Sequence, residues 1–191
     1  MKLHYRGKFD MNPDSLPFSE HEEGAVAFKE PKDIKQMAIV TNVIALITVV
    51  IAYVAVCVRM GIPSLPALIV SMILFALSML PHELIHALCF REDVYLYTSL
   101  KNGMLFVTGT ERMSKGRFVF MSLLPTLIFG VIPFTLGLVF SNGILGAFGA
   151  VSLSAGAGDY INIFNALTQM PKGARCYMHK FNTFWYLPKK P

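Results

Sequence analysis

The chain has 191 residues, of which 54% are hydrophobic and only 15% are charged, and its mean hydropathy is +0.52. This balance excludes an ordinary soluble domain and is typical of a protein that crosses a membrane several times. The formal net charge of +5 calls for anionic lipid headgroups as partners and requires no nucleic acid.

The chain begins with a polar segment, residues 1–36, which we expect to form a cytoplasmic N-terminal tail. Four apolar runs follow, and each is long enough to cross a bilayer as a helix, which takes about 20 residues. They cover residues 37–58, 65–90, 118–140 and 144–167. Residues 168–191 form a second polar tail. The sequence therefore predicts an all-α membrane protein with four transmembrane helices, in one membrane domain over residues 37–167.

Lysine and arginine are distributed unevenly between the links of this predicted bundle. The N-terminal tail carries six, the link after the second run carries five and the C-terminal tail carries five, whereas the other two links carry one and none. Positively charged residues accumulate on the cytoplasmic side of a membrane. We therefore expect a multi-pass protein of the cell membrane with both termini in the cytoplasm.

The link between the second and third runs contains a β-hairpin signal. Two β-rich segments, VYLYTSL and MLFVTGT, flank Asn102-Gly103. A type I′ turn needs positive φ at both central residues, and Asn-Gly satisfies this requirement readily. We expect a short cytoplasmic hairpin over residues 94–110. It either packs on the lipid headgroups or holds an extended substrate strand by strand addition.

Four ionisable side chains fall within the apolar runs: His82, Glu83, His86 and Asp159. Such groups are costly inside a membrane and mark candidate functional sites. His82-Glu83-Leu84-Ile85-His86 is an HExxH motif, and on a helix its two imidazoles project from one face, where both can bind one zinc ion. Glu83 then lies beside the metal as a base for its bound water. The alternative is a polar contact between packed helices.

A catalytic zinc usually has three protein ligands and one open position. The HExxH residues lie four to eight residues before the end of their run, and Asp159 lies about eight residues before the end of its own. At 1.5 Å per residue, all of them lie within about 6–12 Å of the cytoplasmic boundary. We therefore expect Asp159 to be the third ligand. Asn162 shares its helix face, and it either supports the site, contacts substrate or makes an ordinary interhelical contact.

The segments PHELIHAL, SKGRFVFMSLLP and SAGAGDYINIFN, with the hairpin link, resemble a family of small bacterial integral-membrane proteins described as putative zincin peptidases. An HExxH helix followed by an aspartate on a later membrane helix is also distantly similar to the site-2 intramembrane zinc proteases. The local sequence Gly158-Asp159-Tyr160 departs from their pattern. The resemblance implies that His82, His86 and Asp159 bind zinc, that Glu83 is the catalytic base, and that the bacterial plasma membrane is the location.

Two kinds of function are compatible with these residues. The first is a membrane-embedded zinc metalloprotease that cleaves a membrane-associated or transmembrane protein near the cytoplasmic face, with Glu83 as general base. The second is a non-catalytic metal-binding membrane protein that acts as a scaffold, sensor or transporter, and such a site should tolerate Glu83→Gln. A helix bundle without metal is a third and simpler reading.

Overall fold

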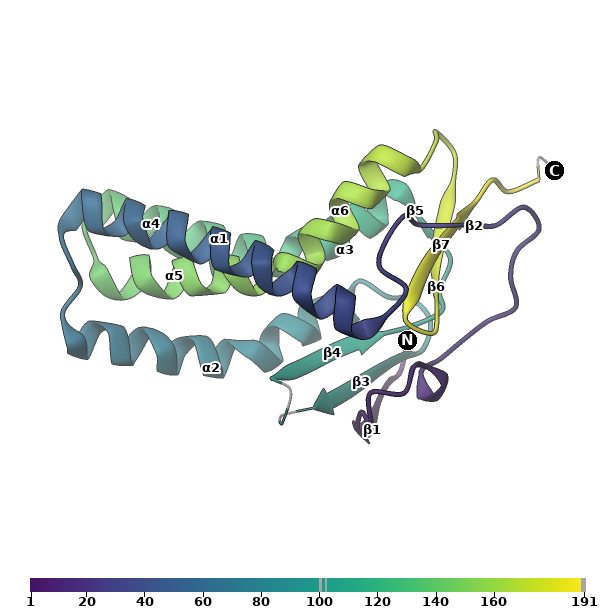
Figure 1. Ribbon diagram of the computed structural model, residues 1–191, viewed down its shortest axis with the longest axis horizontal. Coiled ribbons are helices and arrows are strands. Elements are labelled where there is room, and N and C mark those ends of the chain that lie inside the picture. Colours follow the sequence, from purple (N-terminus) through teal and green to yellow (C-terminus); the bar gives the residue numbers. More distant parts are fainter. Residues whose placement is uncertain (100, 102, 190–191) are drawn as a thin grey trace.

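The structure is a computed structural model that describes residues 1–99, 101 and 103–189. Long helices form one end of the molecule and two small sheets form the other (Figure 1). The helices are α1 (Ile34–Met60), α2 (Leu65–Leu88), α3 (Lys115–Thr126), α4 (Ile132–Phe140), α5 (Gly143–Ala155) and α6 (Ala157–Gln169). A π-helical segment, η3 (Leu127–Val131), joins α3 to α4, and a short 3-10 helix, η1 (Pro13–Ser15), lies near the N-terminus.

The strands are β1 (Leu3–Lys8), β2 (Val26–Ala27), β3 (Val94–Ser99), β4 (Met104–Thr108), β5 (Met113–Ser114), β6 (Arg175–His179) and β7 (Asn182–Tyr186). The first sheet has the order β1-β3-β4, in which β1 is parallel to β3 and β4 is an edge strand. The second sheet has the order β2-β7-β6-β5. Both sheets therefore combine N-terminal strands with strands from much later in the chain.

Among the residues that the structure describes, three segments are long and apolar enough to cross a membrane: α1, α2 and the continuous stretch Lys115–Phe140. Large hydrophobic side chains on these segments are exposed, which suits hydrocarbon as the surrounding medium rather than water. Figure 1 shows α5 between α1 and α2. Helix α5 also packs closely on α4, because a Cβ on Gly149 would collide with the backbone of Phe134 on α4. These features identify the chain as a membrane protein.

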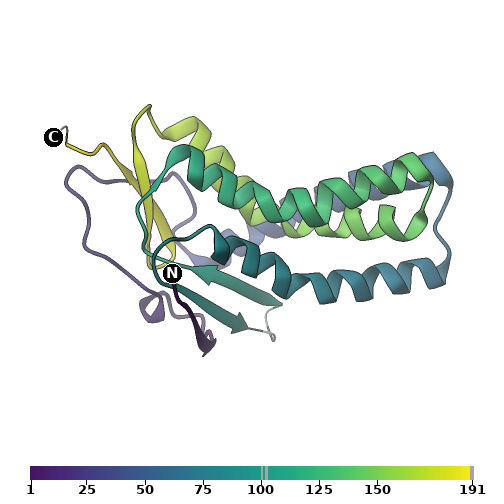
Figure 2. The same cartoon turned by 180° about the vertical axis from the view of Figure 1, so that it is seen from behind.

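The sheet end has a core of its own, which lies where the helix ends meet the strands. Its buried side chains come from the ends of α2, α3 and α6 and from the second sheet, among them Ala87, Phe90, Phe118, Met121, Ala166, Met170 and Cys176. Figure 2 shows from behind how α3 and α6 run into the second sheet. This core fixes the sheets to the ends of the helices that carry the HExxH motif and Asp159.

The prediction of an all-α protein with four transmembrane helices is wrong. Within the described part of the chain, seven strands form two sheets, and three segments rather than four qualify as continuous spans. Strands β2 and β5 have two residues each, so they are too short to show alternating hydrophobicity. The expected hairpin is present as β3 and β4. Its predicted turn residue Asn102 lies outside the described residues.

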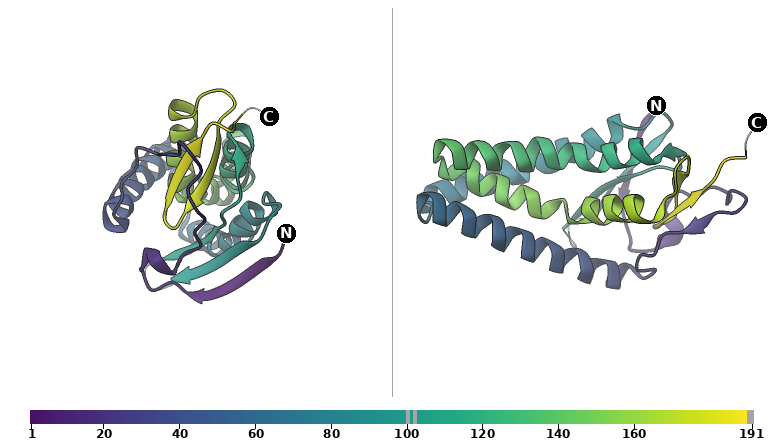
Figure 3. Two further views of the ribbon diagram at one scale, coloured as in Figure 1. Left: turned by 90° about the vertical axis from the view of Figure 1, so that its right-hand side faces the viewer. Right: turned by 90° about the horizontal axis from the view of Figure 1, so that it is seen from above.

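The apolar run at residues 144–167 forms two helices instead of one, because α5 and α6 are bent by 53° relative to each other (Figures 1 and 3). The break falls at Gly156, where any Cβ would collide with the hydroxyl of Thr126 on α3. Only glycine therefore allows α3 this close to the bend. The break places Asp159 in the first turn of a new helix that is aimed differently from α5.

Candidate metal centre

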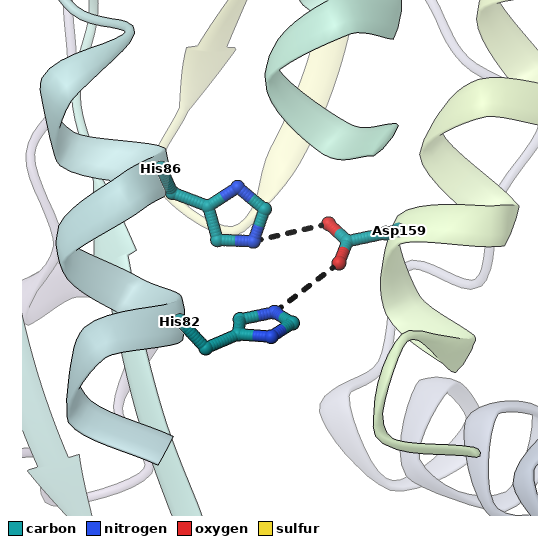
Figure 4. A group of neighbouring side chains, drawn as sticks. All are labelled: His82, His86 and Asp159. Carbon is teal, nitrogen blue, oxygen red and sulfur yellow. Dashed lines mark ion pairs between the residues drawn. The ribbon is translucent and has the colours of Figure 1, made fainter. Parts of the chain in front are cut away.

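Two histidines on α2 face one aspartate on α6 (Figure 4). His82 Nε2 lies 3.5 Å from Asp159 Oδ2, and His86 Nε2 lies 3.4 Å from Asp159 Oδ1. The three ligand atoms all lie within 4.8 Å of one another. Because the histidines are one turn apart on α2, their rings project from the same face, with centroids 5.0 Å apart. The structure thus brings Asp159 beside two histidines that precede it by more than seventy positions in the sequence.

These residues fit a zinc ion. Zinc bonds to nitrogen and oxygen of about 2.0–2.2 Å place neighbouring ligand atoms of a tetrahedral site roughly 3.3–3.6 Å apart. The two N···O separations of 3.5 and 3.4 Å, one to each oxygen of Asp159, fall in this range. Two imidazoles and one carboxylate are also ligands that zinc accepts, and they leave a fourth position for water. Without an ion, three such groups beside apolar helices would be unfavourable.

The neighbouring segments α3 and η3 orient the two imidazoles. His86 Nδ1 lies 3.0 Å from the carbonyl oxygen of Met121, so Nδ1–H donates and Nε2 keeps its lone pair for a metal. The ring of His82 stacks on Phe129 at 6.5 Å between centroids, with an interplanar angle of 25°. Phe129 belongs to η3, and π-helical turns are common at functional sites.

Glu83 follows His82 and contacts the edge of the first sheet. The backbone N–H of Val107 on β4 donates to Glu83 Oε2 over 3.0 Å. The carboxylate is therefore held on the side of the site where β4 passes. It is not among the three residues whose ligand atoms converge.

The candidate site opens into a cavity of about 770 Å³. Its walls come from α1, α2, α6 and β4, and from parts of the N-terminal segment and of the β6–β7 hairpin. The five residues selected from the sequence all line it: His82, Glu83, His86, Asp159 and Asn162. Among the described residues, Asn162 has no hydrogen-bond partner, so its amide is available to the cavity.

The cavity also has polar residues that sequence reasoning missed, namely Glu30, Asn42 and Lys180. Burial raises the pKa of the Glu30 carboxyl above its ordinary value, although a hydrogen bond from the Thr183 N–H (2.7 Å) opposes this change. Nothing in the sequence places Glu30 or Lys180 near α2. Asn42 did leave a signal, because it is a side-chain amide inside an apolar run.

A partly buried ion pair ties the end of α2 to the beginning of α3. Arg117 donates to the Glu111 carboxylate and also to the carbonyl oxygen of Cys89, at 2.7 Å. Burial alone would raise the pKa of Glu111, but the bond from Arg117 and the backbone N–H groups of Arg91 and Glu92 hold it below its ordinary value. The pair fixes the helix that carries the histidines against α3, which carries the Met121 carbonyl.

An HExxH pair of imidazoles on one helix, joined by a carboxylate from another, is the site of a zincin-type protein. The sequence model of the family described as "Putative zincin peptidase" matches residues 75–175, which is more than half of the chain. The chain belongs to this family, and the resemblance seen in PHELIHAL and SAGAGDYINIFN is confirmed. No curated protein and no solved structure matches the chain. The wider resemblance to site-2 proteases stays a prediction.

Proposed function

We propose that this protein is a zinc metallopeptidase that hydrolyses peptide bonds inside the membrane, near its cytoplasmic face. The observation that carries the proposal is the convergence of His82, His86 and Asp159, whose ligand atoms lie within 4.8 Å of one another. Membership of the zincin peptidase family supports the reaction type. The large cavity supports a peptide-sized substrate, which we take to be a membrane-associated or transmembrane protein.

In this mechanism each residue has one role. His82, His86 and Asp159 would hold the ion, and the Met121 carbonyl keeps His86 in the tautomer that can do so. When bound, zinc lowers the pKa of a coordinated water to about 7 and polarises the scissile carbonyl. Glu83 accepts a proton from the attacking water and delivers it to the leaving amine. The apolar helix walls limit access of bulk water.

The free edge of β4 is the place we assign to an extended substrate. Val107 pairs with Leu96 and Leu105 pairs with Thr98 in the antiparallel ladder. The Val107 N–H is directed to Glu83, so it points away from β3. Backbone groups alternate in direction along an antiparallel strand, so the N–H of Leu105, two residues earlier, also points away from β3. A substrate strand added at Leu105 would therefore run beside Glu83. Asn162, across the cavity, is a further hydrogen-bond partner that we propose for the substrate.

We further propose that the sheet end lies in the cytoplasm, in a multi-pass protein of the bacterial plasma membrane with both chain ends on that side. The lysine- and arginine-rich segments, residues 1–36, 91–117 and 168–191, all contribute to the sheets. At the opposite end, the links 61–64 and 141–142 carry no lysine or arginine, and Arg59 in the last turn of α1 is the one such residue nearby. This asymmetry supports the orientation through the positive-inside rule.

The first experiment is the zinc content of the detergent-purified protein, measured by elemental mass spectrometry. We expect about one zinc per chain in the wild type and in Glu83→Gln, and close to none in His86→Ala or Asp159→Ala. Cleavage of a mixed library of quenched fluorogenic peptides should occur only with the wild type. Zinc lost from His86→Ala but retained by Asp159→Ala would reject Asp159 as a ligand.

A non-catalytic metal-binding role is the second candidate, and one observation favours it. Glu83 accepts a backbone hydrogen bond from Val107, as a purely structural carboxylate would. In that case the wild type would bind zinc, and neither it nor Glu83→Gln would cleave any peptide. Glu83→Gln would then differ from the wild type in stability alone.

A further inference from the structure

The first half of α1 forms a wall of the cavity and is less deeply packed than the second half. In α1, which is described throughout, no residue between Ile34 and Ala52 is buried, whereas Ala52 and Val56 are buried near α5. The α1 residues that line the cavity recur every three or four positions: Ile34, Met37, Ala38, Thr41, Asn42 and Ala45. They therefore form one face of the helix, and that face is directed into the cavity.

Asn42 is the polar residue on this face whose side chain has no partner. The two threonines of α1 satisfy their hydroxyls within the helix, Thr41 on the Met37 carbonyl at 2.9 Å and Thr48 on the Ile44 carbonyl at 2.8 Å. Asn42 makes no hydrogen bond with any residue that the structure describes, and it is exposed. Because Asn42 lines the cavity, its amide can pair with a ligand that is bound there.

The position of Asn42 matches that of the metal centre. It lies eight residues into α1, which is about 12 Å from the sheet end, and His82 lies six residues before the end of α2, about 9 Å from the same end. Ala38 and Ala45 lie one turn before and one turn after Asn42, so no large side chain from these positions covers the amide. The amide and the candidate metal ligands thus share one cavity at one level.

We propose that Asn42 binds the peptide backbone of the substrate, in an apolar segment that lies extended along the α1 wall. This inference rests on the proposed peptidase function. A side-chain amide has both a donor and an acceptor, so it can pair with the N–H and C=O of one peptide unit whatever the side chain. The wall around it includes Met37, Phe75 and Met79, which select apolar substrate side chains.

Binding of two hydroxamates to the zinc-loaded, full-length protein in detergent tests this inference. Acetohydroxamate engages only the metal, whereas a leucyl-leucine hydroxamate also presents a peptide backbone. We expect Asn42→Leu to weaken the peptide hydroxamate about five- to tenfold, the effect of one lost hydrogen bond, and to leave acetohydroxamate unchanged. Thr48→Val is the matched control, because Thr48 bonds its own helix and does not line the cavity. It should change neither affinity.

A third ligand, the same peptide hydroxamate with an N-methylated backbone, tests whether Asn42 pairs with the peptide N–H. It should bind the wild type more weakly than its parent does, and this difference should shrink in Asn42→Leu. Equal loss of both hydroxamates in Asn42→Leu, no loss of either, or an altered oligomeric state by light scattering would overturn the role of Asn42. If the zinc-loaded wild type binds acetohydroxamate but not the peptide hydroxamate, the inference about Asn42 fails while the proposed function stands. If it binds neither, the proposed function fails with it.

Discussion

The helical end and the sheet end of this molecule are stabilised in different ways. At the helical end, glycine contacts bring backbones together, and large apolar side chains remain exposed to the membrane. At the sheet end, a buried core and the ion pair between Lys180 and Asp14 join segments from the two terminal regions. The candidate metal ligands come from helices, but the groups that orient or contact the site residues include β4 and Met121 in the middle of α3. The chemistry of the site therefore depends on the boundary between the two ends.

The largest effect should come from breaking the close packing of the helical end. In Gly149→Leu the new side chain would overlap the Phe134 backbone, which cannot move without displacing α4. We expect the stability to fall by about 3 kcal/mol or more, with most of the protein lost from the monodisperse peak in size-exclusion chromatography. Gly158→Ala is the control, since its Cβ would meet nothing within 4 Å. Similar behaviour of both variants would contradict this account of α5.

A smaller loss should follow from removing the charge of Glu111 at the boundary. Glu111→Gln leaves Arg117 half-buried without a counter-charge, so we expect about 2 kcal/mol of destabilisation in thermal unfolding. Glu22→Gln is the matched control. Its partner Arg112 and Glu22 itself are both about one-third exposed, so the loss there should be below about 1 kcal/mol.

The pH dependence of the same pair has a defined sign. Because the pKa of Glu111 is lower in the folded protein than its ordinary value of 4.5, its stabilisation is present above that value and is lost as the pH falls further. The wild type should therefore lose more thermal stability than Glu111→Gln between about pH 6 and pH 3. Parallel losses in the two proteins would show that this carboxylate does not contribute.

The smallest effect on stability, but a large one on turnover, is expected at the free edge of β4. Leu105→Pro removes an N–H that the ladder does not use, so the fold should lose only about 1 kcal/mol. If substrates bind this edge, cleavage of the fluorogenic peptides should fall at least about tenfold while zinc content stays the same. Unchanged cleavage would mean that the first sheet has a structural role only and that substrate does not bind at the edge of β4.

The sequence predicted the candidate site better than the fold around it. His82, Glu83 and His86 share a local helical spacing, and Asp159 followed from counting residues to the end of an apolar run. These are short-range properties of single helices. Strand pairing is different, because β1 and β3 meet across two intervening helices and nothing in LHYRGK specifies VYLYTS as its partner. The break at Gly156 was also hidden, since it depends on a hydroxyl from α3.

The pairing of distant strands has a consequence for the order in which the protein is synthesised. Val26 pairs with Trp185, so the second sheet cannot be completed until Trp185 has been translated. The HExxH helix is made much earlier, and it remains in the membrane without Asp159 while α3 to α6 are still being synthesised. Chains that terminate before Asp159 therefore lack the third candidate ligand. An unfinished product would then carry the motif without a complete metal centre.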